Sequence, residues 1–418
     1  MAKHKYQNKR ANDAEPITKE SAAVSVEPIL SAAEGGESTE FSAATDTGSR
    51  LRYDESGRIP IIDNARGIML ILLMVFGLGL ASGYLPAFWN SHSLTPGLLF
   101  CDLFTPAILF TLGLTLELSF KKRAKTHGKK SARAHLLKRG AAFVAFEVIV
   151  NEIYLLASGN YTAALGFPTW GLYSSLGMGM IAAALFLHLK PKYRLIAIGA
   201  LAVIPYLAEM IFPELIRYLY AGVTVIVPSW GRLDSFFSFG AIILAYSMLT
   251  ELIFKNFKRY VKVYLIIFAL AVLCVLMTYV IQPFVSPAEG TSASEVPAYV
   301  AQYLKNPFVI NLPTFSIGYI IVAVAFGGAC IFIMYGLHNV TQKDIPFIAS
   351  LGKNTFLVYV FFSIMLNINF RIQQYYSSEG LNSLSKSLTV SIAIMVASTA
   401  FICLLTWFLD KRKWYVRL

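Results

Sequence analysis

The sequence predicts an all-α integral membrane protein, a polytopic bundle of about ten transmembrane helices. Of its 418 residues, 56% are hydrophobic and 14% are charged, and the mean hydropathy is +0.58. An ordinary soluble domain carries about 25% charged residues. Apolar runs of about 20 residues, each long enough to cross a bilayer, alternate with short polar links. The lysines and arginines gather in every second link.

Residues 1–58 form a polar segment that is rich in Ala, Glu, Ser and Thr and lacks apolar periodicity. Such a segment cannot bury enough surface to offset its chain entropy, so we predict a disordered cytoplasmic tail. No apolar core follows the early lysines, which excludes a signal peptide. Residues 59–418 are then a single transmembrane domain.

The apolar runs predict ten spans in the second part of the chain. They lie near residues 61–84, 97–120, 140–158, 169–189, 195–212, 235–254, 263–283, 313–336, 347–369 and 387–409. The segment 213–234 fits three interpretations, an interfacial element, a re-entrant element or a further crossing. The loop 284–312 contains several prolines and is long enough to cover a site.

The distribution of positive charge orients these spans. With the tail placed inside, the inner links and the C-terminus hold 21 lysines and arginines, while the outer links hold five. The link 121–139 alone holds nine and contains no acid. This bias follows the positive-inside rule, so both termini are predicted to be cytoplasmic. Membrane orientation therefore explains the net charge of +12, and no nucleic-acid partner is expected.

The four cysteines, Cys101, Cys274, Cys330 and Cys403, all lie in apolar segments. Their spacing matches neither a disulfide framework nor a set of metal ligands. We predict buried thiols and no metal site.

His92 and Asp102 are the predicted catalytic residues. His92 lies in the outer loop before the second span, and the ordinary pKa of histidine suits proton transfer at neutral pH. The common alternative for such a residue is a solvated surface histidine. Asp102 lies about one and a half turns inside that span, where a buried carboxylate is costly and functional by default. An acid that orients an imidazole is a usual arrangement for proton abstraction.

A cluster of cations is predicted to bind a polyanion at the cytoplasmic face. Asp63 and Arg66 lie three residues apart on one face of the first span, which indicates a local ion pair. The alternative is that Arg66 joins the cations of the second link to bind a polyanionic cofactor, because guanidinium groups suit phosphate recognition. The predicted cofactor-binding residues are Arg66, Lys121, Lys122, Arg123 and Arg139.

Further polar residues lie within the apolar runs. Asn354 and Tyr359 in the ninth span, with Asp63, are predicted to line a polar cavity, and interhelical hydrogen bonding is the competing explanation. Glu147, Glu152 and Glu209 are intramembrane acids, and a proton path through them would favour a transporter. The sequence has no Gly-x-x-x-x-Gly-Lys, His-Glu-x-x-His or Gly-x-Ser-x-Gly motif, which argues against an ATP-driven pump and a metalloprotease of that type.

The motif Asp63-x-x-Arg66-Gly67, together with His92 followed by Gly97 and Asp102, resembles motifs of the heparan-α-glucosaminide N-acetyltransferase-like family of transmembrane acyltransferases. The likeness covers roughly residues 59–410 and is strongest over 59–180. Its motifs are Asp63-x-x-Arg66-Gly67, His92 followed by Gly97 and Asp102, Asp102-Leu-Phe-Thr-Pro106 with Gly113, Arg139-Gly140, Gly171-Leu-Tyr-Ser-Ser-Leu-Gly177 and Gly352-x-Asn354-x-x-x-x-Tyr359.

This resemblance implies an N- or O-acetyltransferase of the cytoplasmic membrane. Acetyl-CoA would bind from the cytoplasm as the acyl donor, and an extracytoplasmic saccharide or cell-envelope glycan would accept the acyl group on an amine or hydroxyl. His92 would be central to transfer, as the base or the acyl carrier. The sequence departs from the family in two places: residues 75–83 lack the usual asparagine, and Ser174 replaces a glutamine.

Three interpretations remain open. The first is the acyltransferase, whose partners are the bilayer, acyl-CoA and the glycan, with a homodimer left open. The second is a secondary transporter or flippase for a sugar or lipid-linked substrate, with the three glutamates coupling an ion. The third is a non-catalytic member of the family, which the missing asparagine permits.

Overall fold

The computed structural model describes residues 60–81, 100–157, 172–212, 235–281, 307–310, 316–341, 345–378 and 388–414. Within these ranges the chain forms ten α-helices and two short helical turns, and no strand is present. All of them belong to one compact unit, Gly48–Leu418. The predicted all-α class is therefore confirmed. The N-terminal tail, the loop of His92 and the segment 213–234 lie outside the described residues.

Helix α1 (Pro60–Ala81) corresponds to the first predicted span. The second span begins with a 3-10 turn, η1 (Phe100–Leu103), so Asp102 lies just before α2 (Phe104–Ala157) rather than inside a continuous helix. Helix α2 contains the second and third spans together. Gly128 interrupts it with φ 80° and ψ 159°, a conformation that favours glycine.

The polar link 121–139 joins the second and third predicted spans, and the structure forms it as helix. The helix continues through it on both sides of Gly128, well beyond the apolar runs. The reason is intrinsic propensity, because alanine, leucine, lysine and arginine are good helix formers in water. Hydropathy indicates which parts of α2 are apolar enough to lie in lipid, but it does not indicate where the helix itself ends.

The next four helices match predicted spans. They are α4 (Leu172–Phe186), α5 (Pro191–Ile211), α7 (Ser235–Lys255) and α8 (Phe257–Leu276), which continues into a π-helical turn, η2 (Met277–Ile281). Helix α8 begins at Asn256, whose side-chain oxygen accepts a hydrogen bond from the backbone N–H of Arg259. This capping separates α7 from α8 at a single residue.

The last four helices are α10 (Ile317–Thr341), α11 (Pro346–Lys353), α12 (Thr355–Ser378) and α14 (Leu388–Lys411). The span predicted over 347–369 is not one straight helix. It consists of α11 and α12, which meet at Asn354 with a bend of 85°. Asn354 itself has the non-helical angles φ −107° and ψ 32°.

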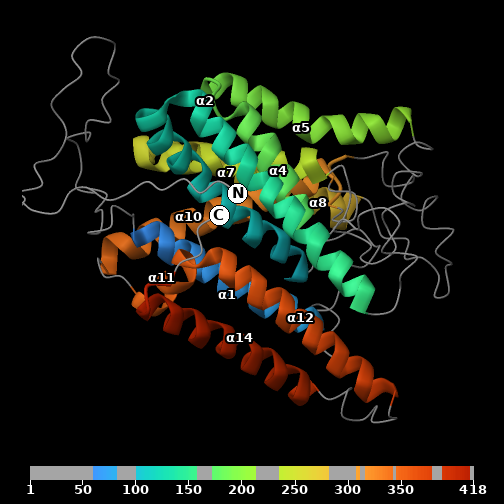
Figure 1. Ribbon diagram of the computed structural model, residues 1–418. Helices are drawn as coiled ribbons and strands as arrows, with labels where there is room; N and C mark the ends of the chain where they lie inside the picture. Colours follow the sequence, from blue (N-terminus) through green and yellow to red (C-terminus); the bar gives the residue numbers. More distant parts are fainter. Residues whose placement is uncertain are drawn as a thin grey trace, which may run out of the picture. The chain divides into compact units, whose positions relative to one another are not determined.

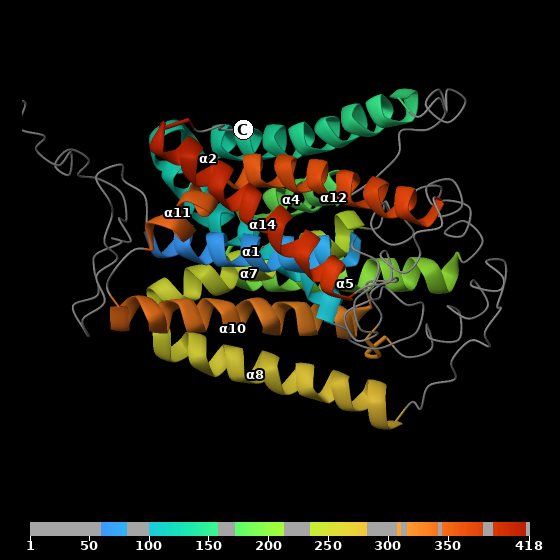
Figure 2. The same cartoon turned by 90° about the horizontal axis from the view of Figure 1, so that it is seen from below.

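The helices pack around α1, α2, α7 and α10 (Figures 1 and 2). Helix α4 packs between α2 and α7, α8 packs along α10, and α11, α12 and α14 pack against α1. Outer helices present large apolar side chains outward, including Leu195 and Ile196 on α5, Ile266 on α8 and Leu404 on α14, which are 57–66% exposed. Water would disfavour such faces, whereas lipid accommodates them.

Five described helices are long and apolar enough to cross a membrane, and the pair α11 and α12 makes a sixth if it counts as one broken span. Helix α4 is apolar but shorter, at 14 residues over Tyr173–Phe186. Helix α1 and the two halves of α2 do not meet the same test within the described residues. A multi-pass membrane protein is thus supported, and ten spans remain a prediction.

Three of the four cysteines, Cys274, Cys330 and Cys403, are free and buried, as predicted. The described part of the chain contains no cluster of residues that could hold a metal ion.

Candidate functional site: a cationic junction beside a broken helix

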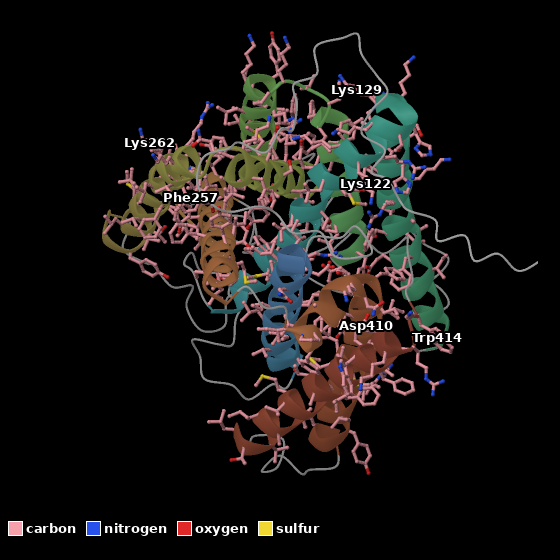
Figure 3. All side chains as sticks on the ribbon, turned by 90° about the vertical axis from the view of Figure 1, so that its left-hand side faces the viewer. Lys122, Lys129, Phe257, Lys262, Asp410 and Trp414 are labelled. Atoms are coloured by element: carbon pink, nitrogen blue, oxygen red, sulfur yellow. The ribbon has the colours of Figure 1, made fainter. Side chains whose placement is uncertain are left out.

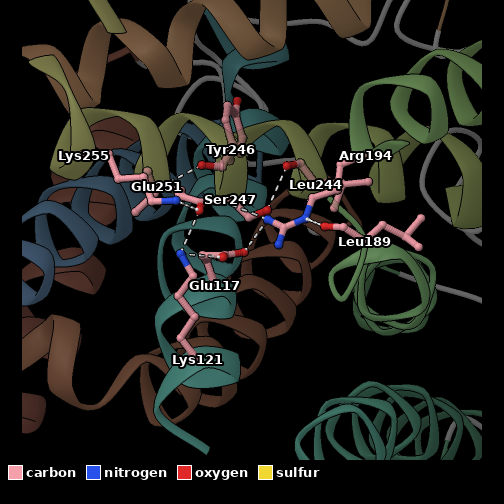
Figure 4. A network of polar contacts seen from close by, with 10 residues as sticks. Glu117, Lys121, Leu189, Arg194, Leu244, Tyr246, Ser247, Glu251 and Lys255 are labelled. Carbon is pink, nitrogen blue, oxygen red and sulfur yellow. Dashed lines mark hydrogen bonds and ion pairs between the residues drawn. The ribbon is translucent and has the colours of Figure 1, made fainter. Parts of the chain in front are cut away.

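Figure 3 views the bundle from a side on which Lys122, Lys129 and Lys262 are labelled. Two groups of cations among the described residues concern the site. The first group is an ion network that joins α2, α5 and α7, with Glu117, Arg194 and Glu251 at its least exposed part (Figure 4). Glu117 and Glu251 are its two carboxylates, and Lys121, Arg194 and Lys255 are its three cations.

Distances in this network are short. Arg194 Nη1 lies 2.8 Å from Glu117 Oε2 and 3.1 Å from Glu251 Oε2. Lys121 Nζ lies 3.0 Å from Glu117 Oε1 and 2.9 Å from Glu251 Oε1. The Arg194 Nε–H also donates to the backbone oxygen of Leu189. Lys121, predicted to bind a cofactor, is therefore occupied by two carboxylates, and its position fits a structural role.

The second group contains Arg66, Arg123 and Arg139, and we call these three residues the cationic junction. Arg66 makes the predicted ion pair with Asp63, with 3.5 Å between Nη1 and Oδ1. It also donates from Nη2 to the hydroxyl of Thr355, the first residue of α12. The junction thus links α1 to the break between α11 and α12.

Electrostatic effects connect Arg139 with Arg66, and His135 with both Arg123 and Arg139. Burial and the nearby Arg66 guanidinium lower the pKa of Arg139, the last residue before the predicted span 140–158. Burial, and then Arg123, Arg139 and Lys138, lower the pKa of His135 on the same helix. Several cations therefore converge here on α1 and α2.

Arg123 and Arg139 differ from the cations of the ion network, because no carboxylate among the described residues neutralises them. The Nε atoms of Arg123 and Arg139 are buried and have no hydrogen-bond partner, and neither side chain has an acidic partner among the described residues. A buried charge without a partner is costly unless something else pairs with it. Lys122, the remaining predicted cation, is exposed.

Asn354 lies directly beside the junction. Its side chain is 1% exposed, and neither its amide nitrogen nor its amide oxygen has a hydrogen-bond partner. Two residues near it in the chain contact α1: Gly352 packs against the backbone of Asp63, and Thr355 accepts a hydrogen bond from Arg66. The structure therefore brings the sequence-predicted Asp63, Arg66 and Asn354 together.

A polar stripe continues from this point along α12. Thr355, Tyr359 and Ser363 repeat every four residues, so they lie on one face of the helix. Tyr359 shares a hydrogen bond of 2.5 Å with Thr111 on α2. The Tyr173 hydroxyl donates to the backbone oxygen of Tyr359 at 2.6 Å and contacts the Ser363 hydroxyl. Tyr359 is thus part of an interhelical hydrogen-bond chain, the competing explanation given above.

Aromatic rings line the same region between α2, α4 and α12. Phe146 packs edge-to-face against both Phe356 and Tyr173 at 5.5 Å between ring centres, and Phe143 packs against Phe356 at 6.0 Å. Tyr173 in turn packs against Tyr359 at 6.1 Å. These rings therefore pack beside the polar stripe, in which Thr355 and Tyr359 are buried and Ser363 is half-buried.

Glu147 occupies a position at the start of α4. Its Oε2 accepts a hydrogen bond of 2.7 Å from the backbone N–H of Tyr173. Helix N-termini attract negative charge, so this carboxylate is placed to stabilise α4. The side chains of Glu152 and Glu209 lie outside the described residues.

Asp102 lies at the opposite end of α2. It is 4% exposed, and its backbone oxygen accepts a hydrogen bond of 2.9 Å from the hydroxyl of Tyr319. The helix between Phe104 and Lys121 spans about 25 Å at 1.5 Å per residue, close to the thickness of a bilayer core. The predicted partner His92 falls outside the described residues, so the pair stays a prediction.

Sequence reasoning missed the ion network. Glu117 and Lys121, and Glu251 and Lys255, are each four residues apart on their helices, a spacing that indicates ion pairs. Nothing in the sequence indicated Arg194 as their common partner, because its contacts join residues 57 and 77 positions apart.

Comparison with known proteins adds no assignment. No protein-family model matches the sequence, and no curated protein is a significant match.

Proposed function

We propose that this protein is a membrane-embedded acyltransferase that moves an acetyl or other acyl group from cytoplasmic acyl-CoA to an extracytoplasmic saccharide. The proposal rests on the resemblance of the motifs and on one structural observation. That observation is the cationic junction, in which three arginines converge and two of them, Arg123 and Arg139, have no acidic partner among the described residues.

The junction has the chemistry that the phosphates of CoA require. Arginine presents several donors in a fixed planar arrangement that matches phosphate oxygens, and it stays charged when buried. Arg66, Arg123 and Arg139 are the residues that would hold the phosphates, and Lys122 would attract them from the rim. Lys121 is left out, because Glu117 and Glu251 already neutralise it. Bound acyl-CoA would supply the thioester from which the acyl group is transferred.

The arrangement of helix ends supports the proposed orientation. Ends assigned to the cytoplasm by the charge bias contact one another: the ion network joins α2, α5 and α7, and Arg66 joins α1 to α12. Ends assigned to the outside also meet, since Tyr319 bonds to Asp102 and the N–H of Ile310 bonds to Thr278. In the proposal the chain has ten spans in the cytoplasmic membrane, with both termini inside.

His92 and Asp102 carry out the transfer in this proposal, on the extracytoplasmic side. His92 would take the proton from the amine or hydroxyl that attacks the acyl carbon, while the thioester C–S bond breaks and CoA leaves as the thiol. Alternatively, the imidazole would first take the acyl group from the thioester, with release of CoA, and then pass it to the acceptor. Asp102, which is buried within the outer part of the bundle, holds the imidazole in orientation. The polar stripe of α12 provides hydrogen-bonding groups between the two ends.

The substitution Arg139→Gln tests the donor site. One lost hydrogen bond between charged groups costs about 1.5–3 kcal/mol, so the dissociation constant for acetyl-CoA should rise about tenfold or more. Calorimetric titration of the purified protein in detergent measures it. Lys129→Gln is the matched control, since it removes an exposed charge from the same helix at a residue outside the proposed site, and it should change affinity about twofold or less. Equal effects of the two substitutions would refute the assignment.

A further inference from the structure

A second feature of the junction, the carboxamide of Asn354, is not explained by phosphate binding. Asn354 is 1% exposed, and both polar atoms of its side chain lack a partner, although its backbone is satisfied on both sides. The Asn354 N–H donates to the oxygens of Ser350 and Leu351, and its own oxygen accepts from the N–H of Val358 at 3.0 Å. Only the side chain is left unpaired.

Asparagine is an unfavourable choice at this position for folding alone. An apolar residue could occupy the bend without leaving a buried donor and acceptor unpaired, which is a substantial penalty. The bend itself does not need asparagine, because its φ of −107° is open to any residue. A buried amide that the described residues leave unpaired indicates a ligand as its partner.

The partner must satisfy both a donor and an acceptor. A carboxamide presents N–H groups and a carbonyl oxygen together. Phosphate and thioester oxygens only accept, so neither satisfies the whole group, whereas a secondary amide carries one donor and one acceptor and is complementary to it. The chemistry of Asn354 thus matches an amide-containing ligand.

The position of Asn354 indicates which part of acyl-CoA would contact it. It is more deeply buried than Arg123 and Arg139, which are half-buried, and it lies next to the contact between Arg66 and Thr355. A group bound there lies further inside the bundle than the phosphates. In acyl-CoA, the narrow pantetheine arm, which contains two amides, leads away from the phosphates toward the thioester.

We propose that Asn354 binds an amide of the pantetheine arm and positions the thioester end of the donor. This inference rests on the proposed function, since it takes acyl-CoA as the ligand of the junction. Gly352 and Thr355 hold Asn354 in place against α1. Asn354 is therefore a residue that recognises the arm, as distinct from the arginines that recognise the phosphates.

The test compares two ligands on the full-length protein in detergent. One ligand is CoA, and the other is 3′-phosphoadenosine 5′-phosphate, which keeps the nucleotide and lacks the arm. Asn354→Ala and Asn354→Leu should each weaken CoA binding about tenfold and leave binding of the nucleotide unchanged. Asn367→Ala is the matched control, because Asn367 lies exposed on α12 and bonds only to the backbone oxygen of Ser363.

Thermal unfolding separates ligand binding from a structural role. Because the amide has no partner among the described residues, both substitutions should leave the unfolding temperature unchanged or raise it. A lower unfolding temperature in both variants, unchanged CoA binding, or equal weakening of both ligands would overturn the inference. Failure of the wild-type protein to bind either ligand would instead refute the proposed function, and this inference with it.

Discussion

The charged residues at the site form two groups, one expected to stabilise the fold and one expected to bind a ligand. The ionic partners of each residue distinguish the two groups. Glu117 and Glu251 are matched by three cations, so the ion network compensates for the cost of burying charge. The cationic junction has Asp63 beside Arg66 but no acid beside Arg123 or Arg139 among the described residues. Residues of the network are expected to affect stability, and residues of the junction to affect ligand binding.

The substitution Arg194→Ala tests this distinction. It leaves Glu117 and Glu251 with fewer counter-charges in a buried site, so we expect a loss of about 3–5 kcal/mol in stability. Thermal or denaturant unfolding in detergent measures the change. Lys192→Ala, an exposed cation two residues away, should have almost no effect. If Arg194→Ala unfolded like the wild type, the network would have no structural role.

Prediction from the sequence succeeded at the residue scale where partners are close along the chain. The pair Asp63 and Arg66 was predicted from its spacing, and the structure confirms it. Arg194 was not recognised, because its partners come from distant helices. Of the predicted site residues, Asp63, Arg66, Arg139 and Asn354 gather at one place, whereas Lys121 does not join them.

At the scale of the helices, glycines fix the contact between α1 and α11. A methyl group on Gly352 would overlap the backbone oxygen of Asp63, and one on Gly67 would overlap that of Ile348. Both clashes involve backbone atoms, which cannot rotate aside as a side chain can. The two helices therefore approach closely only because these positions carry no Cβ.

We predict that Gly352→Ala forces α11 away from α1. The protein should lose about 1–3 kcal/mol of stability, as expected for overpacking, and the junction should bind acetyl-CoA more weakly. Gly336→Ala in α10 is the control, because a methyl group there has nothing within 4 Å and alanine favours the helix. The same loss of stability in both variants would show that close packing is not the cause.

Hydropathy predicted where helices occur more accurately than it predicted the breaks within them. Every predicted span has a helix within it, because a segment in lipid must satisfy its own backbone. The break at Asn354 was not predicted, since Lys353 and Asn354 resemble ordinary polar residues in an apolar run. Its cause is tertiary: the close approach of Gly352 to α1 and the bond between Thr355 and Arg66 hold the bend.

At the scale of the whole transmembrane unit, charge bias gives an orientation that labelling can test. Lys129 lies beside Gly128 at the turn of α2 and is exposed, and Ser93 follows His92 in the loop assigned to the outside. In a cysteine-free background, Lys129→Cys should react with an impermeant maleimide only from the cytoplasmic face. Ser93→Cys should react only from the outer face. Labelling of both from one face would refute the proposed topology.

The most direct test of the account follows the acyl group in purified protein. Wild type and His92→Ala are incubated with acetyl-labelled acetyl-CoA, and label on the protein or released as acetate is measured. The account predicts that both proteins bind acetyl-CoA through the cationic junction, and that only the wild type transfers the label. Binding by neither protein, or equal transfer by both, would contradict an acyltransferase that acts through His92.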